Sequence, residues 1–258
     1  MLILLLSSYS LFNQYHKVSL KRIVLESDKL VGSFSIVQFS DLHLNYSKSS
    51  KRLRKTIERV NDLSPDVIVI TGDVLDANLT KTDSFANILK GLKSKYGVYA
   101  VTGNHEYYVG INNFIKFSKD CNIAVLLDEF VTLNDRINII GINDSEIQRF
   151  ETSVELNKYR TLIKPNMFNI LLSHRPEIFD DASQHGADLV LSGHTHAGQI
   201  PPADLILKMF FKYNYGLYKK NNSYLYLTSG TGFWGPPMRL FSSNEIIHIV
   251  IKNRKKSD

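Results

Sequence analysis

The chain has 258 residues, of which 43% are apolar and 22% are charged, and its formal net charge is +6. This length and composition are typical of a single globular domain, and no repeat or low-complexity tract marks a linker. The single cysteine, Cys121, excludes an intramolecular disulfide framework and a cysteine-based zinc site. Any bound metal must therefore be held by nitrogen and oxygen ligands.

Two short runs of sequence carry much of the positive charge. Such runs usually form solvated faces, but they also suit an anionic membrane surface or a phosphate-bearing substrate. Charge alone leaves nucleic acid open as a partner. The basic residues of the two runs are Lys51, Arg52, Arg54, Lys55, Lys252, Arg254, Lys255 and Lys256.

The amino-terminal residues 1–12 are apolar, but this stretch is shorter than the roughly 20 residues that span a bilayer. It has no basic region and no cleavage site of a secretory signal. We expect residues 1–25 to be an interfacial anchor, the remnant of a longer anchor, or a segment docked on the core. Residues 26–258 are expected to form one domain.

Short apolar segments recur along the chain, and polar motifs follow several of them. Residues 34–40 alternate as a strand does, and residues i and i+2 of an extended segment point to the same side, so Asp41 and His43 can hold one ion together. The β-branched run 66–71 predicts a strand covered on both faces, and it ends at Gly72-Asp73. Further strands are predicted at 97–102, 123–127, 137–142, 167–172, 187–191, 224–228 and 245–251, and helices at 50–63 and 82–93.

Three more of these predicted strands end in histidine motifs. They lead to Gly103-Asn104-His105, to Ser173-His174, and to Gly193-His194-Thr195-His196. Alternation of strands and helices indicates an α/β fold, in which the carboxyl ends of parallel strands carry the site. The expected metal ligands are Asp41, His43, Asp73, Asn104, His174, His194 and His196.

Seven ligands are too few for two separate ions unless one carboxylate bridges them, and Asp73 is the natural bridge. Two ions roughly 3.5 to 4 Å apart can clamp a phosphoryl group and share a hydroxide. Mixed nitrogen and oxygen ligation suits two divalent ions, with manganese as our first expectation and iron, zinc or cobalt as alternatives to it.

The ordered set Asp-x-His, Gly-Asp, Gly-Asn-His, an isolated His and Gly-His-Thr-His resembles the calcineurin-like metallophosphoesterase superfamily. Residues 103–108 and 230–240 are similar to its bacterial membrane-associated branch, which includes a UDP-2,3-diacylglucosamine pyrophosphatase. The resemblance implies a four-layer αββα sandwich, in which two mixed sheets are flanked by helices. The sequence departs from the family pattern at two positions. Arg175 follows the isolated histidine, and Ala197 stands where a second glycine is common.

The resemblance further implies the role of each site residue. One ion would be held by Asp41, His43, Asp73 and His196. The other would be held by Asp73, Asn104, His174 and His194. The catalytic residue would be His105, which would contact the phosphoryl group or protonate the leaving group.

These observations predict a metal-dependent hydrolase that cleaves a phosphodiester or pyrophosphate by attack of a bridging hydroxide. We expect a lipid-linked substrate such as UDP-2,3-diacylglucosamine or a phospholipid, with a nuclease or a cyclic-nucleotide phosphodiesterase as the alternative. A non-catalytic metal-binding scaffold is an alternative of another class, but it predicts missing ligands. The protein is expected to be a monomer that binds no nucleic acid and sits peripherally on a bacterial inner membrane, at the cytoplasmic face.

Two features outside the motifs complete the expectations. Residues 202–218 are predicted to form a basic, apolar cap that faces the membrane, as a helix with Leu205, Ile206, Met209, Phe210 and Tyr213 on one face. The alternative is that this face covers the core. We expect Trp234, which lies between glycines and prolines, to be a packing anchor rather than a substrate surface.

Overall fold

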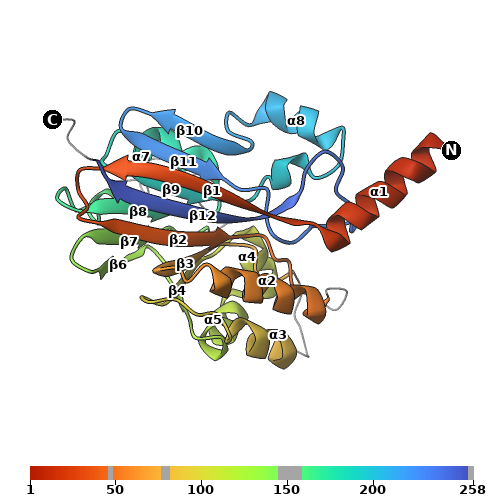
Figure 1. The fold of residues 1–258 in the computed structure, drawn as a ribbon, viewed down its shortest axis with the longest axis horizontal. Helices are drawn as coiled ribbons and strands as arrows, with labels where there is room; N and C mark the ends of the chain where they lie inside the picture. Colours follow the sequence, from red (N-terminus) through yellow and green to blue (C-terminus); the bar gives the residue numbers. More distant parts are fainter. Residues whose placement is uncertain (46–48, 77–81, 145–158, 255–258) are drawn as a thin grey trace.

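The computed structural model describes residues 1–45, 49–76, 82–144 and 159–254. Lys255 and Lys256, predicted to belong to a basic run, lie outside these residues. The described part of the chain forms two six-stranded sheets that pack face to face, with helices on their outer sides (Figure 1).

The first sheet has the strand order β1-β12-β2-β3-β4-β5. Its strands are β1 (Val18–Ser27), β12 (Asn244–Asn253), β2 (Ser33–Phe39), β3 (Val67–Thr71), β4 (Val98–Val101) and β5 (Ile123–Val125). β12 runs antiparallel to β2, whereas the other neighbours are parallel, so the sheet is mixed.

The second sheet has the strand order β10-β11-β9-β8-β7-β6. Its strands are β10 (Gly216–Lys220), β11 (Ser223–Leu227), β9 (Leu189–Ser192), β8 (Phe168–Leu172), β7 (Ile137–Gly141) and β6 (Glu129–Leu133). The two edge strands β10 and β6 are antiparallel to their neighbours, and the four inner strands are parallel.

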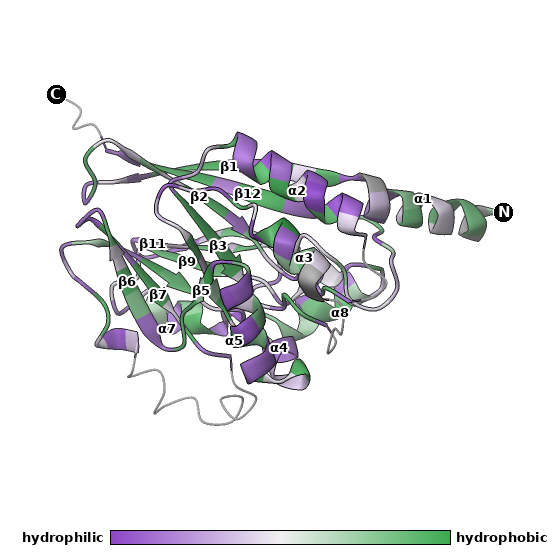
Figure 2. Ribbon diagram, turned by 90° about the horizontal axis from the view of Figure 1, so that it is seen from below, coloured by the Kyte–Doolittle hydropathy of each residue, from purple (hydrophilic) through white to green (hydrophobic). Residues whose placement is uncertain are grey.

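Three clusters of buried apolar side chains join the layers. The central cluster contains Ile36 of the first sheet and Ile170 of the second, so it lies between the sheets. A second cluster packs the outer face of the first sheet against α2 (Ser50–Asp62), α3 (Thr82–Leu89) and α5 (Ile111–Asp120). The third packs the second sheet against Phe179 of α7 (Phe179–Ala182). Figure 2 shows strands such as β3 and β9 as largely hydrophobic, whereas α2, α4 and α5 carry many hydrophilic residues. The predicted four-layer sandwich is confirmed.

Parallel strands of both sheets point their carboxyl ends toward the same rim of the molecule. The segments that follow β2, β3, β4, β8 and β9 carry all seven predicted ligands. Two short helical elements begin at a predicted ligand, α4 (Asn104–Val109) after β4 and η3 (His196–Gly198) after β9. After β8 comes η2 (Pro176–Ile178).

The structure corrects the prediction for residues 202–218. The helix α8 (Ala203–Phe210) ends where Phe211 takes an extended conformation, and the chain then enters β10. Tyr213 is not on the helix; it is 8% exposed, and its ring lies 5.3 Å from that of Phe179. The remaining residues of the predicted face are exposed, and α8 has no buried residue. The exposed fractions of Leu205, Ile206, Met209 and Phe210 are 59%, 49%, 80% and 76%.

The amino-terminal segment forms α1 (Leu2–His16), which projects from the body of the molecule (Figure 1). Its carboxyl-terminal half is docked: Asn13 Nδ2 donates to the backbone oxygens of Arg239 and Ser242 at 3.0 and 2.8 Å. Its other half exposes large apolar side chains, among them Leu4 and Leu5. None of the described helices combines the length and the apolar character that a membrane span requires.

Candidate metal centre

Several predicted ligands lie in segments of unusual backbone conformation. Asp41, His43, Asp73 and His196 have φ values of 54°, 46°, 51° and 52°. Residues with a Cβ adopt this left-handed conformation at a cost, and such residues concentrate at functional sites. Backbone bonds between the segments offset that cost, as Asp41 donates to the Gly72 oxygen and His43 to the Asp73 oxygen, both at 3.0 Å.

The first group of ligand atoms comes from the segment after β2 and from η3. Nε2 of His43 lies 3.0 Å from Nε2 of His196, and the latter lies 3.5 Å from Oδ1 of Asp41. His43 directs Nε2 into this group because its Nδ1 faces Asp76 Oδ1 at 3.3 Å. A histidine that donates from one ring nitrogen presents the other as a ligand. Two nitrogens and one oxygen therefore converge, as a cation of mixed ligation requires.

The second group comes from the segments that follow β3, β8 and β9. Nε2 of His174 lies 3.1 Å from Asp73 Oδ2 and 3.2 Å from Nδ1 of His194. The other nitrogen of His174 donates to the Thr71 oxygen at 2.8 Å, which fixes Nε2 as the nitrogen that faces Asp73. Asp73 Oδ2 is also 3.7 Å from His43 Nε2. Asp73 thus lies between the two groups, where a bridging ligand belongs.

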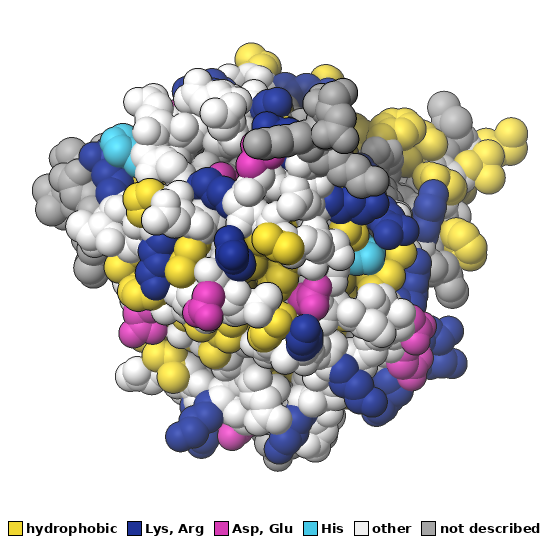
Figure 3. Space-filling model, turned by 60° about the vertical axis from the view of Figure 1, so that its left-hand side comes forward, with side chains coloured by type: hydrophobic (Ala, Val, Ile, Leu, Met, Phe, Trp, Pro, Cys, Tyr) yellow, Lys and Arg dark blue, Asp and Glu magenta, His cyan; other side chains and the backbone are white. Residues whose placement is uncertain are grey.

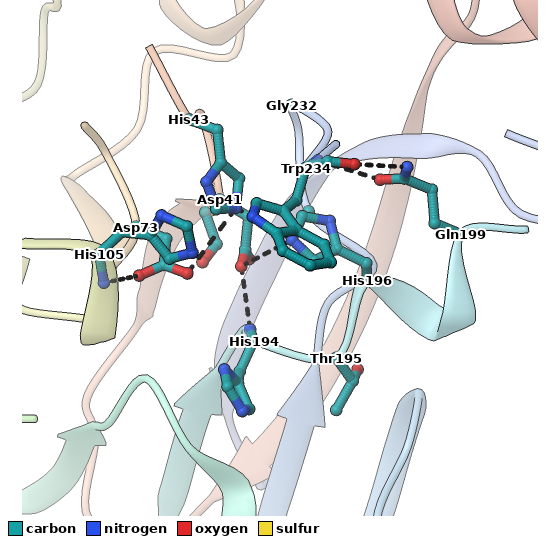
Figure 4. A network of polar contacts seen from close by, with 12 residues as sticks. Asp41, His43, Asp73, His105, His194, Thr195, His196, Gln199, Gly232 and Trp234 are labelled. Atoms are coloured by element: carbon teal, nitrogen blue, oxygen red, sulfur yellow. Dashed lines mark hydrogen bonds and ion pairs between the residues drawn. The ribbon is translucent and has the colours of Figure 1, made fainter. Parts of the chain in front are cut away.

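Two buried oxygens support a fit to metal ions. Among the described residues, neither Asp41 Oδ2 nor Asn104 Oδ1 has a hydrogen-bond partner. A buried polar atom without a partner is costly, and ligation of a cation removes that cost. With these two residues, all seven predicted ligands lie at one rim (Figure 4 labels five of them), and the residues present fit a pair of divalent ions.

The protonation of the cluster reflects its burial and its opposite charges. Burial raises the pKa of Asp41. Burial opposes a protonated His174, but the negative charge on Asp73 outweighs it and raises the pKa of His174 to about 10. In turn His174 lowers the pKa of Asp73 against the effect of burial. The carboxylates stabilise positive charge here, so protons and metal ions compete for the same atoms.

Asp76 was missed by the sequence analysis. Its Oδ1 lies 2.8 Å from Nδ1 of His105 and 3.3 Å from Nδ1 of His43, and its Oδ2 accepts from Asn45. One carboxylate thus orients a predicted ligand and the predicted catalytic histidine. The available signal was a second aspartate three residues after Asp73, within Gly-Asp-Val-Leu-Asp.

Glu106 is another supporting residue that the sequence did not reveal. It is fully buried, and its carboxylate accepts from the backbone nitrogens of Asp73, Val74, Leu75 and Gly103 at 2.7 to 3.1 Å. It therefore ties the segment after β3 to the segment after β4. Burial and the nearby charge of Asp73 raise the pKa of Glu106 to about 7.

Arg239 supports the other side of the site. Its side chain is fully buried, and it donates to the backbone oxygens of His196, Ser229 and Gly232 at 3.1, 2.6 and 3.1 Å. Burial lowers the pKa of Arg239 to about 10. Its backbone nitrogen bonds to Ser10 of α1 at 3.2 Å, so the amino-terminal helix is connected to a ligand segment.

Arg175, one of the two departures from the family pattern, lies directly beside the site. It donates to Asp144 Oδ1 at 2.8 Å, and its Nη1 is 3.0 Å from His194 Nε2. The other departure, Ala197, has a φ of 51° inside η3. Neither residue displaces a predicted ligand from the two groups.

Comparisons with known proteins agree with this geometry. The family model for calcineurin-like phosphoesterases matches residues 34–198. A metallophosphoesterase of Aquifex aeolicus is 34% identical over 257 residues, covering 97% of both chains. One from Helicobacter pylori is 36% identical over 236 residues, 89% of this chain and 63% of the relative, so the chain spans less than two thirds of that protein.

Two further similarities concern a protein named as a transmembrane protein and a solved structure. A transmembrane protein with metallophosphoesterase domain from Danio rerio is 32% identical over 263 residues, 96% of this chain and 60% of that protein. The solved NAD nucleotidase of Haemophilus influenzae superposes with a TM-score of 0.52 at 15% identity, over 77% of this chain and 51% of that one. At that identity the likeness concerns the fold alone.

Proposed function

Because the chain belongs to the calcineurin-like phosphoesterase family, we propose that it hydrolyses a phosphodiester or pyrophosphate bond of a lipid-linked substrate. The family assignment confirms the resemblance drawn from the motifs, and with it the class of metal-dependent phosphoester hydrolases. The bond, the lipid and the membrane location are our proposals. A nucleotide-diphosphate lipid or a phospholipid is the substrate class we favour.

The exposed apolar face of α8 is the observation that supports a lipid-linked substrate. This helix follows the last two predicted ligands in the chain, and the ring of Phe211 at its end lies 6.3 Å from that of His194. Large apolar side chains that a helix leaves in water are a contact surface when they gather on one element. A lipid bilayer beside the metal centre would cover these side chains and deliver the substrate.

A second apolar element stands beside α8. The helix α1 exposes Leu4 and Leu5, and a cavity of about 390 Å³ lies between the two helices, lined in part by Tyr9 of α1 and Leu207 of α8. Lys17 and Lys208 also line it, as suits anionic lipid headgroups. We place the protein peripherally on a bacterial inner membrane, with both helices in the interface. The Danio rerio relative bears the name of a transmembrane protein.

The chemistry assigns a task to each group of residues. Bound divalent ions, with manganese as our first candidate, supply the charge that stabilises the phosphoryl oxygens and activates water. Asp73 holds the two ligand groups at a fixed separation. His105 donates a proton to the leaving oxygen, and Asp76 keeps its ring oriented and favours its charged form, since this contact raises the pKa of His105 although burial opposes it.

The alternative functions predict other surface features or no turnover. A nuclease needs a continuous basic track. On the one face that Figure 3 shows, with the left-hand side of Figure 1 turned forward, lysines and arginines are scattered. A cyclic-nucleotide phosphodiesterase would need no apolar face on α8. A scaffold without activity would bind metal and turn over nothing.

The experiment is a substrate panel with the purified, metal-loaded protein. The panel contains a nucleotide-diphosphate lipid, a phospholipid, a cyclic nucleotide and single-stranded DNA. The proposal predicts the highest kcat/KM for one of the two lipids in mixed micelles. Preference for the DNA or the cyclic nucleotide would support those alternatives, and stoichiometric metal without turnover of any compound would support the scaffold.

A further inference from the structure

Trp234 does not serve as the packing anchor that the sequence suggested. Its side chain is 58% exposed, whereas the preceding Phe233 is 5% exposed and its ring lies 6.4 Å from that of Tyr15. The indole ring instead stands 6.4 Å from the imidazole of His105, at an interplanar angle of 77°. Phe233 therefore anchors this loop, and Trp234 is left at the mouth of the site.

The side-chain amide of Gln199 binds both the backbone nitrogen and the backbone oxygen of Trp234. Its nitrogen donates to Gln199 Oε1 at 3.1 Å, and its oxygen accepts from Gln199 Nε2 at 2.8 Å (Figure 4). Gly232 donates to the Asp41 oxygen at 3.0 Å, and a Cβ there would lie 2.3 Å from that oxygen. The loop is thus packed directly on a ligand segment, so the backbone that carries the indole has a fixed position relative to the metal centre.

A second exposed aromatic ring lies against the same histidine. Tyr108 of α4 is 61% exposed, and its ring is 5.2 Å from that of His105 at 68°. Two aromatic side chains that are far apart in sequence therefore flank the residue that we assign to the leaving group. Neither ring is stacked face to face on the imidazole.

We propose that Trp234 is the stacking surface for a planar heteroaromatic base carried by the leaving group, with Tyr108 as the second wall. This inference rests on the proposed function, because it needs the leaving group to sit at His105. Stacking on indole suits any nucleobase, since each presents a π-face and no hydrogen-bond pattern is required. The substrate class that follows is a nucleoside diphosphate or nucleoside phosphodiester, whose lipid part extends toward α8.

Membrane contact is the competing role for an exposed tryptophan, because indole is enriched at membrane interfaces. The observed contacts favour stacking on a nucleobase over contact with a membrane. The exposed aliphatic side chains of the proposed membrane face lie on α1 and α8, whereas the ring contact of Trp234 is with His105. The bonds to Gln199 also hold the backbone of Trp234 beside the site rather than on either helix.

Trp234 is the single tryptophan of the chain, so its fluorescence reports on this position alone. We would titrate the wild-type protein, with and without added divalent metal, with uridine monophosphate, with ribose 5-phosphate as the matched base-free ligand, and with anionic phospholipid vesicles. The proposal predicts saturable quenching by uridine monophosphate and little change with ribose 5-phosphate. Equal responses to both ligands, no response to either, or a response to vesicles alone would overturn it.

Variants test the same point through kinetics. Trp234→Leu should raise the KM for a nucleoside 5′-phosphodiester roughly 10- to 100-fold, and Trp234→Phe should lose less because it keeps a π-face. Phe130→Leu, a partly exposed aromatic position on β6, is the control. Equal losses in both Trp234 variants would contradict stacking. A wild-type protein whose fluorescence is quenched by uridine monophosphate but that cleaves neither a phosphodiester nor a pyrophosphate would refute the proposed function and leave the base site standing.

Discussion

The Nδ1 atom of His105 lies 2.8 Å from Oδ1 of Asp76, so the predicted catalytic histidine has a half-buried carboxylate partner. Although burial lowers the pKa of His105, the bond to Asp76 outweighs it, and the pKa of His105 is raised. His105 is therefore protonated to a higher pH than a free histidine. If it acts as the acid, activity should persist below this raised pKa and fall as the pH rises through it.

We expect Asp76→Asn to move the alkaline limb of the kcat profile to lower pH, because the neutral amide no longer stabilises the imidazolium. The rate should also fall roughly 10- to 100-fold, as is usual when a residue that orients a site is lost. The measurement is the pH dependence of kcat with metal content determined in parallel. Asp28→Asn, at an exposed ion pair with Arg254, is the control. An unshifted alkaline limb would show that Asp76 does not influence the proton transfer.

Gly103→Ala should disrupt the bridging position. A Cβ at residue 103 would lie 2.2 Å from Oδ1 of Asp73 and 2.8 Å from its backbone nitrogen, so the carboxylate has to move. We expect loss of bound metal together with loss of activity. The control is Gly32→Ala, where the φ of 82° makes alanine strained but no atom lies within 4 Å.

Both glycine variants should melt at a lower temperature than the wild type, but only Gly103→Ala should lose metal. Metal analysis of the folded proteins distinguishes the two effects. Full metal occupancy in Gly103→Ala would show that the Asp73 carboxylate can shift without leaving the site.

Replacing Ile206, Met209 and Phe210 of α8 together by serine tests the membrane face. Because these side chains are exposed, the melting temperature should change little. Binding to anionic liposomes and turnover of a micellar lipid substrate should fall strongly, and hydrolysis of a soluble aryl phosphodiester should fall far less. Val31→Ser, at an exposed apolar residue between β1 and β2, is the control. Equal loss of both activities with a lower melting temperature would show that α8 is structural.

The rim of the site could be predicted from the sequence because each ligand follows a strand directly. Asp41 and His43 come after β2 and Asp73 after β3, and strands that read as buried are easily located. Parallel neighbouring strands bring such positions together regardless of the conformation of the connecting loops. The same local logic predicted helix α2 closely, since Leu53, Ile57 and Val60 form its buried face.

Supporting residues could not be found in this way, because their partners are distant in the chain. Asp76 is recognised by its contact with His105, and Arg239 by its burial against the backbone of His196. The neighbours of Trp234 in sequence do not reveal its place, because its backbone is held by Gln199, which is distant in the chain. The end of α8 was overestimated, since apolar periodicity continued to Tyr213 although that side chain packs on Phe179.

The central claim is that Asp73 bridges two metal ions while His105 binds none. The most direct test is metal content per chain, measured beside kcat, in the wild type, Asp73→Asn and His105→Asn. We predict two ions in the wild type, reduced occupancy of both sites and no hydrolysis in Asp73→Asn, and two ions in His105→Asn with a rate lower by roughly 10²- to 10⁴-fold. Loss of metal in His105→Asn, or two retained ions in Asp73→Asn, would contradict this assignment.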